Sequence, residues 1–238
     1  MKKCLLVLLL IPMIGFSQTK NVISTFRIFA KPEKSLELEK ALAAHAQKYH
    51  TGDWKWRVFE IQSGPDAGGF HVTEGPNSWT ANDTRGNLGT EHTADWAKNV
   101  QPLTNGEGGA SYAVFREDLS TTQVTAFTDK ISINHLYPKQ GEGHKVEARL
   151  KKFKKVWEAS GQTVAVYQAH YSGEPQFSVV FRHKNGWKEK EDGYLKPMKE
   201  RWDAVYGEGS YEEWLDTTSS VESSWGEMLV LRPELSSK

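Results

Sequence analysis

The sequence contains almost no cysteine and carries no net charge. Cys4 is the only cysteine among 238 residues, and 30 lysine and arginine side chains are balanced by 30 aspartate and glutamate side chains. A single thiol excludes an internal disulfide and a zinc or iron site built from several cysteines. Because the chain has no basic excess, it lacks the electrostatic footprint of nucleic-acid-binding proteins, and we expect no nucleic-acid partner.

Long hydrophobic runs are also absent. The apolar stretch Leu5–Ile14 is shorter than the roughly 20 residues of a transmembrane helix, so we predict no membrane span. Lys2 and Lys3 precede this stretch, and a small residue, Ser17, follows it. This pattern is typical of a signal peptide, here residues 1–17 with cleavage after Ser17, and it predicts a periplasmic or secreted protein.

The sequence also lacks the short motifs of several large enzyme classes. It contains no GxSxG, no HExxH, no P-loop and no dinucleotide-binding glycine pattern. The absence of these motifs means that no reaction type can be assigned from a local pattern. The arrangement of the whole chain is therefore the main source of functional inference.

What the sequence does contain is an internal repetition at an offset of 108 residues. The offset superposes two apolar stripes, pairing Leu38 with Val146, Leu42 with Leu150, His45 with Phe153, and Tyr49 with Trp157. Both stripes have the i, i+4, i+7, i+11 spacing of an amphipathic helix. Further matches continue in the same order along the chain, which predicts two copies of one unit.

Each copy has the same predicted order of elements. We expect strands at 22–30 and 131–137, helices at 33–50 and 142–160, strand pairs at 54–62 with 70–74 and 163–171 with 177–183, helices at 84–101 and 193–206, and last strands at 110–116 and 225–232. The order βαββαβ is that of a ferredoxin-like domain. We predict repeats at 18–120 and 131–238, a linker at 121–130, and an acidic insertion at 207–224.

Packing arguments suggest how the two copies meet. A four-stranded antiparallel sheet with both helices on one face leaves its other face uncovered. The segment 54–59 carries bulky side chains on both faces, so the second face also needs cover. We therefore predict that the two antiparallel sheets face each other and form an α+β barrel within one chain.

The order of elements, the repetition, and Trp79 and Trp187 near strand ends resemble the dimeric α+β barrel superfamily. This group includes antibiotic-biosynthesis-monooxygenase-like and NIPSNAP-like proteins and haem-binding chlorite dismutases. The resemblance implies a small-molecule-binding protein, which the signal peptide predicts to be exported, with a cofactor-independent monooxygenase or a haem-dependent enzyme as alternatives. A non-catalytic interaction module that acts through the acidic insertion is a further alternative, and a homo-oligomer stays open.

Basic and aromatic residues on the predicted strands are candidates for a ligand site between the sheets. These candidates are Arg27, Trp56, Arg57, His71, His135, His170 and Arg182. If they face inward, they would form a basic pocket with aromatic walls, suited to an anionic or planar ligand. Strand alternation alone does not decide which face is inside, so outward, solvated positions fit the pattern equally. A haem-dependent relative would use one of these histidines as its axial ligand.

Three histidines on the predicted helices form a second candidate group. His45 and His92 stand where the second copy has Phe153 and Met198, and His50 lies at the end of the first helix. A buried imidazole needs a hydrogen-bond partner or a metal ion, so these residues could form a cluster. We favour separately hydrogen-bonded core histidines and predict no metal site, because a zinc ion needs three or four ligands in a tetrahedral array.

Overall fold

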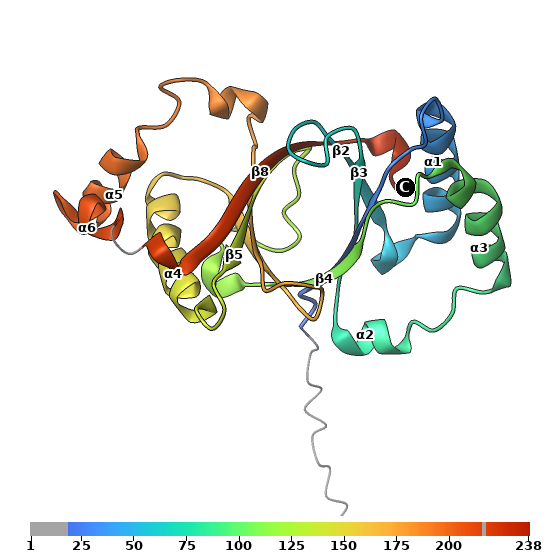
Figure 1. The fold of residues 1–238 in the computed structure, drawn as a ribbon, viewed down its shortest axis with the longest axis horizontal. Helices are drawn as coiled ribbons and strands as arrows, with labels where there is room; N and C mark the ends of the chain where they lie inside the picture. The colour runs from blue at the N-terminus through green and yellow to red at the C-terminus, as the bar shows by residue number, and fades with distance from the viewer. Residues whose placement is uncertain (1–18, 216–217) are drawn as a thin grey trace, which may run out of the picture.

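The structure is a computed structural model that describes residues 19–215 and 218–238 (Figure 1). The predicted signal peptide therefore lies outside the described residues. The strands are β1 (Val22–Ile28), β2 (Trp56–Ile61), β3 (Phe70–Asn77), β4 (Ala110–Phe115), β5 (Lys130–Pro138), β6 (Val164–Ala169), β7 (Phe177–Arg182) and β8 (Val221–Leu231). The helices are α1 (Ser35–Tyr49), α2 (Trp79–Thr84), α3 (Thr90–Asp95), α4 (Gly143–Ala159), α5 (Met198–Tyr206) and α6 (Ser210–Leu215).

The eight strands form one closed antiparallel barrel. Their order around the barrel is β1-β3-β2-β8-β5-β7-β6-β4. Each half of the chain contributes four neighbouring strands, and the two halves join where β2 pairs with β8 and β4 pairs with β6. Closure pairs the backbone groups at both sheet edges, which would otherwise be exposed. The predicted α+β barrel is confirmed, whereas the origin of its halves as copies of one unit stays a prediction.

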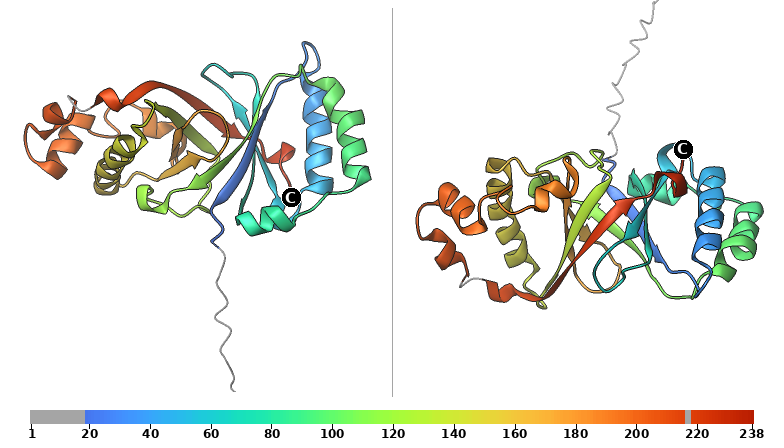
Figure 2. Two further views of the ribbon diagram at one scale, coloured as in Figure 1. Left: turned by 60° about the horizontal axis from the view of Figure 1, so that its bottom comes forward. Right: turned by 90° about the horizontal axis from the view of Figure 1, so that it is seen from above.

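Helices cover the outside of the barrel at opposite ends of the molecule (Figure 2). In the first half, Leu38 and Leu42 of α1 pack with Val58 and Val72 of the sheet. In the second half, apolar residues of α4 pack in the same way on β6 and β7. The apolar stripes seen in the sequence therefore face the outer surfaces of the sheets, and the inner surfaces remain available for a site.

The predicted helix at 84–101 is wrong in its boundaries. Helix α2 ends at Thr84, and Gly86 and Gly89 then adopt positive φ angles of 67° and 96°. Such angles suit glycine and interrupt a right-handed helix. The chain becomes helical again at Thr90, and the helix continues with a π-helical turn at Trp96–Val100.

Two boundaries in the second half also differ from the prediction. Helix α5 begins at Met198 and not at 193, because Pro197 precedes it and restricts the backbone. The segment 207–224, predicted as an acidic insertion, contains regular secondary structure. It contains α6, whose Trp214 is buried against Trp202, and β8 starts within it at Val221.

Within the described ranges, no helix combines the length and hydropathy that crossing a bilayer requires.

Candidate functional site

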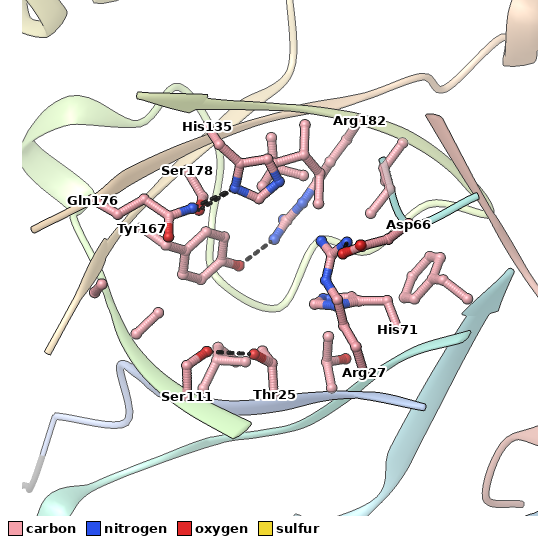
Figure 3. A pocket seen from close by; sticks show the side chains of 18 of the residues that line it. Thr25, Arg27, Asp66, His71, Ser111, His135, Tyr167, Gln176, Ser178 and Arg182 are labelled. Carbon is pink, nitrogen blue, oxygen red and sulfur yellow. Dashed lines mark hydrogen bonds and ion pairs between the residues drawn. The ribbon is translucent and has the colours of Figure 1, made fainter. Parts of the chain in front are cut away.

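The barrel encloses a cavity of about 320 Å³ (Figure 3). All eight strands contribute side chains to its wall. On β5 the lining residues are Ile131, Ile133, His135 and Tyr137, so alternate positions of this strand face inward. The volume lies within the range of small-molecule sites, which is roughly 300–1,000 Å³. Strand alternation did not decide which face of β5 is inside, and the structure shows that it is the face that carries His135.

A buried carboxylate next to the cavity holds two residues of its wall, Arg27 and His135. The side chain of Glu227 on β8 is 0% exposed. It accepts hydrogen bonds from Arg27 Nη2 at 2.5 Å and from His135 Nε2 at 2.7 Å. Arg27 also pairs with Asp66, which is 34% exposed. Burial alone would raise the pKa of Glu227, but the hydrogen bonds from His135 and Arg27 lower it below its ordinary value.

The ring of His135 has different partners on its two nitrogens. Nε2–H donates to Glu227. Nδ1 accepts a hydrogen bond from the side-chain amide of Gln176 (Figure 3). The ring stacks on Trp225, with centroids 4.0 Å apart and planes 25° apart. This arrangement fixes the ring, and the lone pair of Nδ1 is engaged by Gln176, which also lines the cavity. A proton taken up at Nδ1 would give an imidazolium stabilised by the Glu227 carboxylate.

On another part of the wall, Arg182 holds the linker between the two halves. It donates hydrogen bonds to the carbonyls of Gln123 at 2.8 Å and Ala126 at 2.6 Å, and to the hydroxyl of Tyr167 at 2.8 Å. The linker residue Phe127 also lines the cavity, 5.1 Å from the Arg182 guanidinium. These contacts engage Arg182 in tying the linker to the barrel, which limits its availability to a ligand.

His71 on β3 also lines the cavity, on the same side as Arg27 and His135. Its Nδ1 is buried and has no hydrogen-bond partner among residues 19–215 and 218–238. Burial and the nearby charge of Arg27 lower the pKa of His71 to about 3. The ring is therefore neutral at physiological pH and offers one unsatisfied ring nitrogen.

Replacing His71 with leucine is expected to make the protein less sensitive to acid. In the wild type the unfolded chain binds a proton near the ordinary pKa of 6.5, whereas the folded chain does so only near pH 3. The free energy of unfolding is therefore unaffected by His71 above pH 6.5, and it decreases as the pH falls from 6.5 toward 3 because the unfolded chain binds the proton more readily. Between pH 7 and 4.5 the loss amounts to roughly 2–3 kcal/mol.

Urea unfolding at both pH values measures this difference. The loss between pH 7 and 4.5 should be smaller by that amount in His71→Leu, whatever the change in absolute stability. His144→Ala, at an exposed position of α4, should keep the full loss. Equal losses in the wild type and in His71→Leu would show that His71 titrates normally.

The structure places four of the seven proposed ligand-binding residues on the cavity wall. These are Arg27, His71, His135 and Arg182. The other three lie elsewhere: Trp56 packs on the helix side, Arg57 lies against Phe127 and donates to the Gly75 carbonyl, and His170 is exposed beside Trp79. His45, His50 and His92 do come together, outside the barrel between the helices and the sheet.

Sequence reasoning missed several residues of the cavity. These are Asp66, Tyr167, Gln176 and Trp225 on the wall, and Glu227, which contacts the wall residue His135. One signal could have identified Glu227, since it is the only charged residue in the otherwise apolar segment 225–231. A buried strand seldom contains a carboxylate unless the carboxylate has a partner.

Comparisons with known proteins support the fold. No family model matches the chain, and no curated protein matches its sequence. Among solved structures, an anthrone oxidase-like protein superposes with a TM-score of 0.55 at 13% identity, covering 90% of this chain and 92% of that one. A protein of Fusobacterium nucleatum proposed to be a monooxygenase gives 0.53 at 11% identity, covering 88% and 91%.

A mutant chlorite dismutase from Candidatus Nitrospira defluvii is similar to the same extent. It superposes with a TM-score of 0.51 at 8% identity, covering 91% of this chain and 94% of that one. Each of these structures matches nearly the whole chain, so the similarity includes both halves of the barrel. At such low identity it shows the fold and not the activity.

Proposed function

We propose that this chain, which has the fold of the dimeric α+β barrel superfamily, binds a small planar molecule that carries an ionisable hydroxyl group. The observation that carries the proposal is a largely apolar cavity of about 320 Å³ with His135 fixed in its wall by Glu227. Apolar lining residues such as Phe59 and Ile133 would contact the ring of the ligand. Its hydroxyl would donate to His135 Nδ1 in place of the Gln176 amide.

A second candidate function is oxidation of the bound molecule by dioxygen. The proton of the ligand hydroxyl would pass to His135 Nδ1, and Glu227 at 2.7 Å from Nε2 would stabilise the resulting imidazolium. The deprotonated ligand is electron-rich and would be oxidised by dioxygen to a quinone. One oxygen atom would become a carbonyl on the ring carbon opposite the hydroxyl, and the other would leave as water with the hydrogens lost from the hydroxyl and that carbon. The anthrone oxidase-like neighbour and the neighbour proposed to be a monooxygenase support this second function.

Haem is the cofactor implied by the resemblance to chlorite dismutases, and the residues of the cavity do not fit it. His71, the lining imidazole with an unpartnered ring nitrogen among the described residues, lies beside the cationic Arg27, which disfavours an iron cation there. The cavity also lies at the lower end of the range for drug-sized ligands, which are smaller than haem. We therefore derive no step through haem at this site.

The export of the protein is part of this proposal. Cleavage after Ser17 would leave Gln18 as the first residue of the mature chain, and the intact mass of the secreted protein tests this. The alternative of an interaction module has less support, because α6 in the segment 207–224 packs its Trp214 into an aromatic cluster. The duplication and a homo-oligomer stay predictions.

Titration with 1-naphthol and with 1-methylnaphthalene tests the proposed function. The two probes have similar shape, but only 1-naphthol can donate a hydrogen bond to His135. A hydrogen bond within a charged network contributes about 1.5–3 kcal/mol, so 1-naphthol should bind about 10–100-fold more tightly. Quenching of tryptophan fluorescence, with Trp225 on the cavity wall, provides the signal.

Two variants check that the preference arises at His135. The preference should disappear in His135→Phe, which keeps an aromatic ring on Trp225. Gln176→Ala removes the competing amide and should keep or increase the preference. Equal affinities for the two probes in the wild type, or an unchanged preference in His135→Phe, would refute the proposal.

A further inference from the structure

Three imidazoles meet outside the barrel, between the first-half helices and the sheet. His45 lies on α1, His50 directly follows α1, and His92 lies on α3. One ring nitrogen of each lies within 4.8 Å of the others. The cluster is separate from the barrel cavity, whose lining includes none of these three residues. It is therefore a candidate site that the proposed function does not use.

Two carboxylates set the orientation of these rings. His45 Nδ1 lies 2.7 Å from Asp95 Oδ2, and His50 Nδ1 lies 2.9 Å from Glu74 Oε2. An ionised carboxylate can only accept a hydrogen bond, so the Nδ1 atom of His45 and of His50 carries the hydrogen. The Nε2 atom of each ring therefore keeps its lone pair. The same arrangement, in which the second ring nitrogen donates to a carboxylate, is the rule for metal-binding histidines.

The Nε2 atom of His50 has no hydrogen-bond partner within the described residues. His50 is 3% exposed, and this atom is itself buried. The ring is held in place by stacking on Trp56 at a centroid distance of 3.6 Å. An unsatisfied buried acceptor costs about 1–3 kcal/mol, and a bound ion would remove this cost.

The second half of the chain shows that the fold does not require these polar groups. The sequence comparison pairs His45 with Phe153 and His92 with Met198. Phe153 and Met198 pack with Trp202 and other aromatic residues in an apolar cluster. The same kind of space between helices and sheet is thus filled by hydrophobic side chains in one half and by three imidazoles in the other.

We propose that His45, His50 and His92 bind a divalent transition-metal ion, with zinc as the best match. Metal–nitrogen bonds of 2.0–2.1 Å in a tetrahedral array place the ligand nitrogens about 3.3 Å apart. The Nε2 atoms of His45 and His92 share a hydrogen bond at 3.2 Å, so an ion that replaced the shared proton would find these two atoms at the required spacing. All three ligand nitrogens lie within 4.8 Å of one another, so a pair at that limit would have to approach by about 1.5 Å.

The charges around the cluster suit a cation. Glu74 and Asp95 carry two negative charges, of which Arg85 neutralises one, so a net negative charge remains beside a bound ion. Arg85 donates to Glu74 at 2.6 and 2.8 Å and so holds the carboxylate against His50. Three neutral imidazoles with an open fourth position are the ligand set of catalytic zinc sites. The sequence-based expectation of no metal did not take these carboxylates into account.

Metal titration of the tag-free mature protein tests the proposal. After dialysis against EDTA, Co²⁺ should bind with one equivalent and give the visible absorption of a tetrahedral site, and Zn²⁺ should displace it. His92→Ala should weaken Zn²⁺ binding by at least about 100-fold, and Asp95→Asn by about 10–100-fold. The exposed His144→Ala is the matched control and should bind as the wild type does.

The outcomes separate this proposal from the one for the barrel cavity. The absence of a stoichiometric ion, or binding that is unchanged in His92→Ala, would overturn the metal site. If His92→Ala does not fold, His92→Gln keeps the size of the side chain and serves in its place. Binding of 1-naphthol to the cavity should be the same in the wild type and in the His92 variants, so each proposal can fail alone.

Discussion

Replacing Glu227 with alanine is expected to destabilise the protein by about 3–5 kcal/mol, because it removes the buried counter-charge of Arg27 and leaves only the partly exposed Asp66 to pair with it. Glu227 accepts hydrogen bonds from both Arg27 and His135, and its side chain is fully buried. The remaining carboxylate partner of Arg27, Asp66, is partly exposed and cannot replace it. Urea unfolding at pH 7 measures the change.

The same strand offers a control for this substitution. Glu222 on β8 is exposed, and Glu222→Ala should change the free energy of unfolding by no more than about 0.5 kcal/mol. A double variant, Arg27→Met with Glu227→Leu, replaces the ion pair with apolar groups and should recover much of the loss. A cost below about 1 kcal/mol for Glu227→Ala would mean that the buried network does not hold the barrel together.

The stabilisation that Glu227 provides is expected to decrease in acid. The pKa of Glu227 is lowered by its hydrogen bonds to His135 and Arg27, against the opposing effect of burial. Its contribution is therefore present above the ordinary pKa of 4.5 and is lost as the pH falls through the lowered value in the folded protein. The gap in stability between the wild type and Glu227→Ala should narrow below pH 4.5.

Filling the cavity from β4 is expected to abolish ligand binding. Ala113 faces the cavity, and a phenylalanine at this position would occupy the space that a planar ligand needs. The affinity for 1-naphthol should fall by about 100-fold or more, which corresponds to about 2.7 kcal/mol. Because the new ring enters existing space, Ala113→Phe should retain the thermal unfolding midpoint to within a few degrees.

Strand alternation provides the control for this prediction. Tyr112 is the neighbour of Ala113 and is 42% exposed, so its side chain points away from the cavity. Tyr112→Phe should bind 1-naphthol with unchanged affinity. Unchanged affinity in Ala113→Phe would place the probe outside the barrel and contradict the proposed site.

The overall fold could be predicted from the sequence because its signals are local and occur twice. The apolar stripe that contains Leu38 and Leu42 recurs as Val146 and Leu150, and both stripes do cover a sheet. The helix expected at 84–101 failed because apolar spacing alone does not reveal the positive φ angles of Gly86 and Gly89. The interruption of the helix between Thr84 and Thr90 becomes visible only in the backbone conformation.

The candidate sites could be predicted only in part, because their partners come from distant segments. Arg27 and Glu227 are 200 positions apart, and no spacing rule connects them. For the histidine cluster, the sequence identified His45, His50 and His92 but not Glu74, a residue of β3 whose carboxylate contacts His50. Which histidine faces which carboxylate is determined by the packing of helices on the sheet.

The most direct test of the central claim is the position of a bromine atom in crystals soaked with 4-bromophenol. The claim is that the barrel cavity binds planar hydroxylated molecules. It predicts an anomalous bromine peak between the two sheets, with the phenol oxygen within hydrogen-bonding distance of His135 Nδ1. Bromine peaks confined to the outer surface, with the cavity unchanged, would contradict the claim.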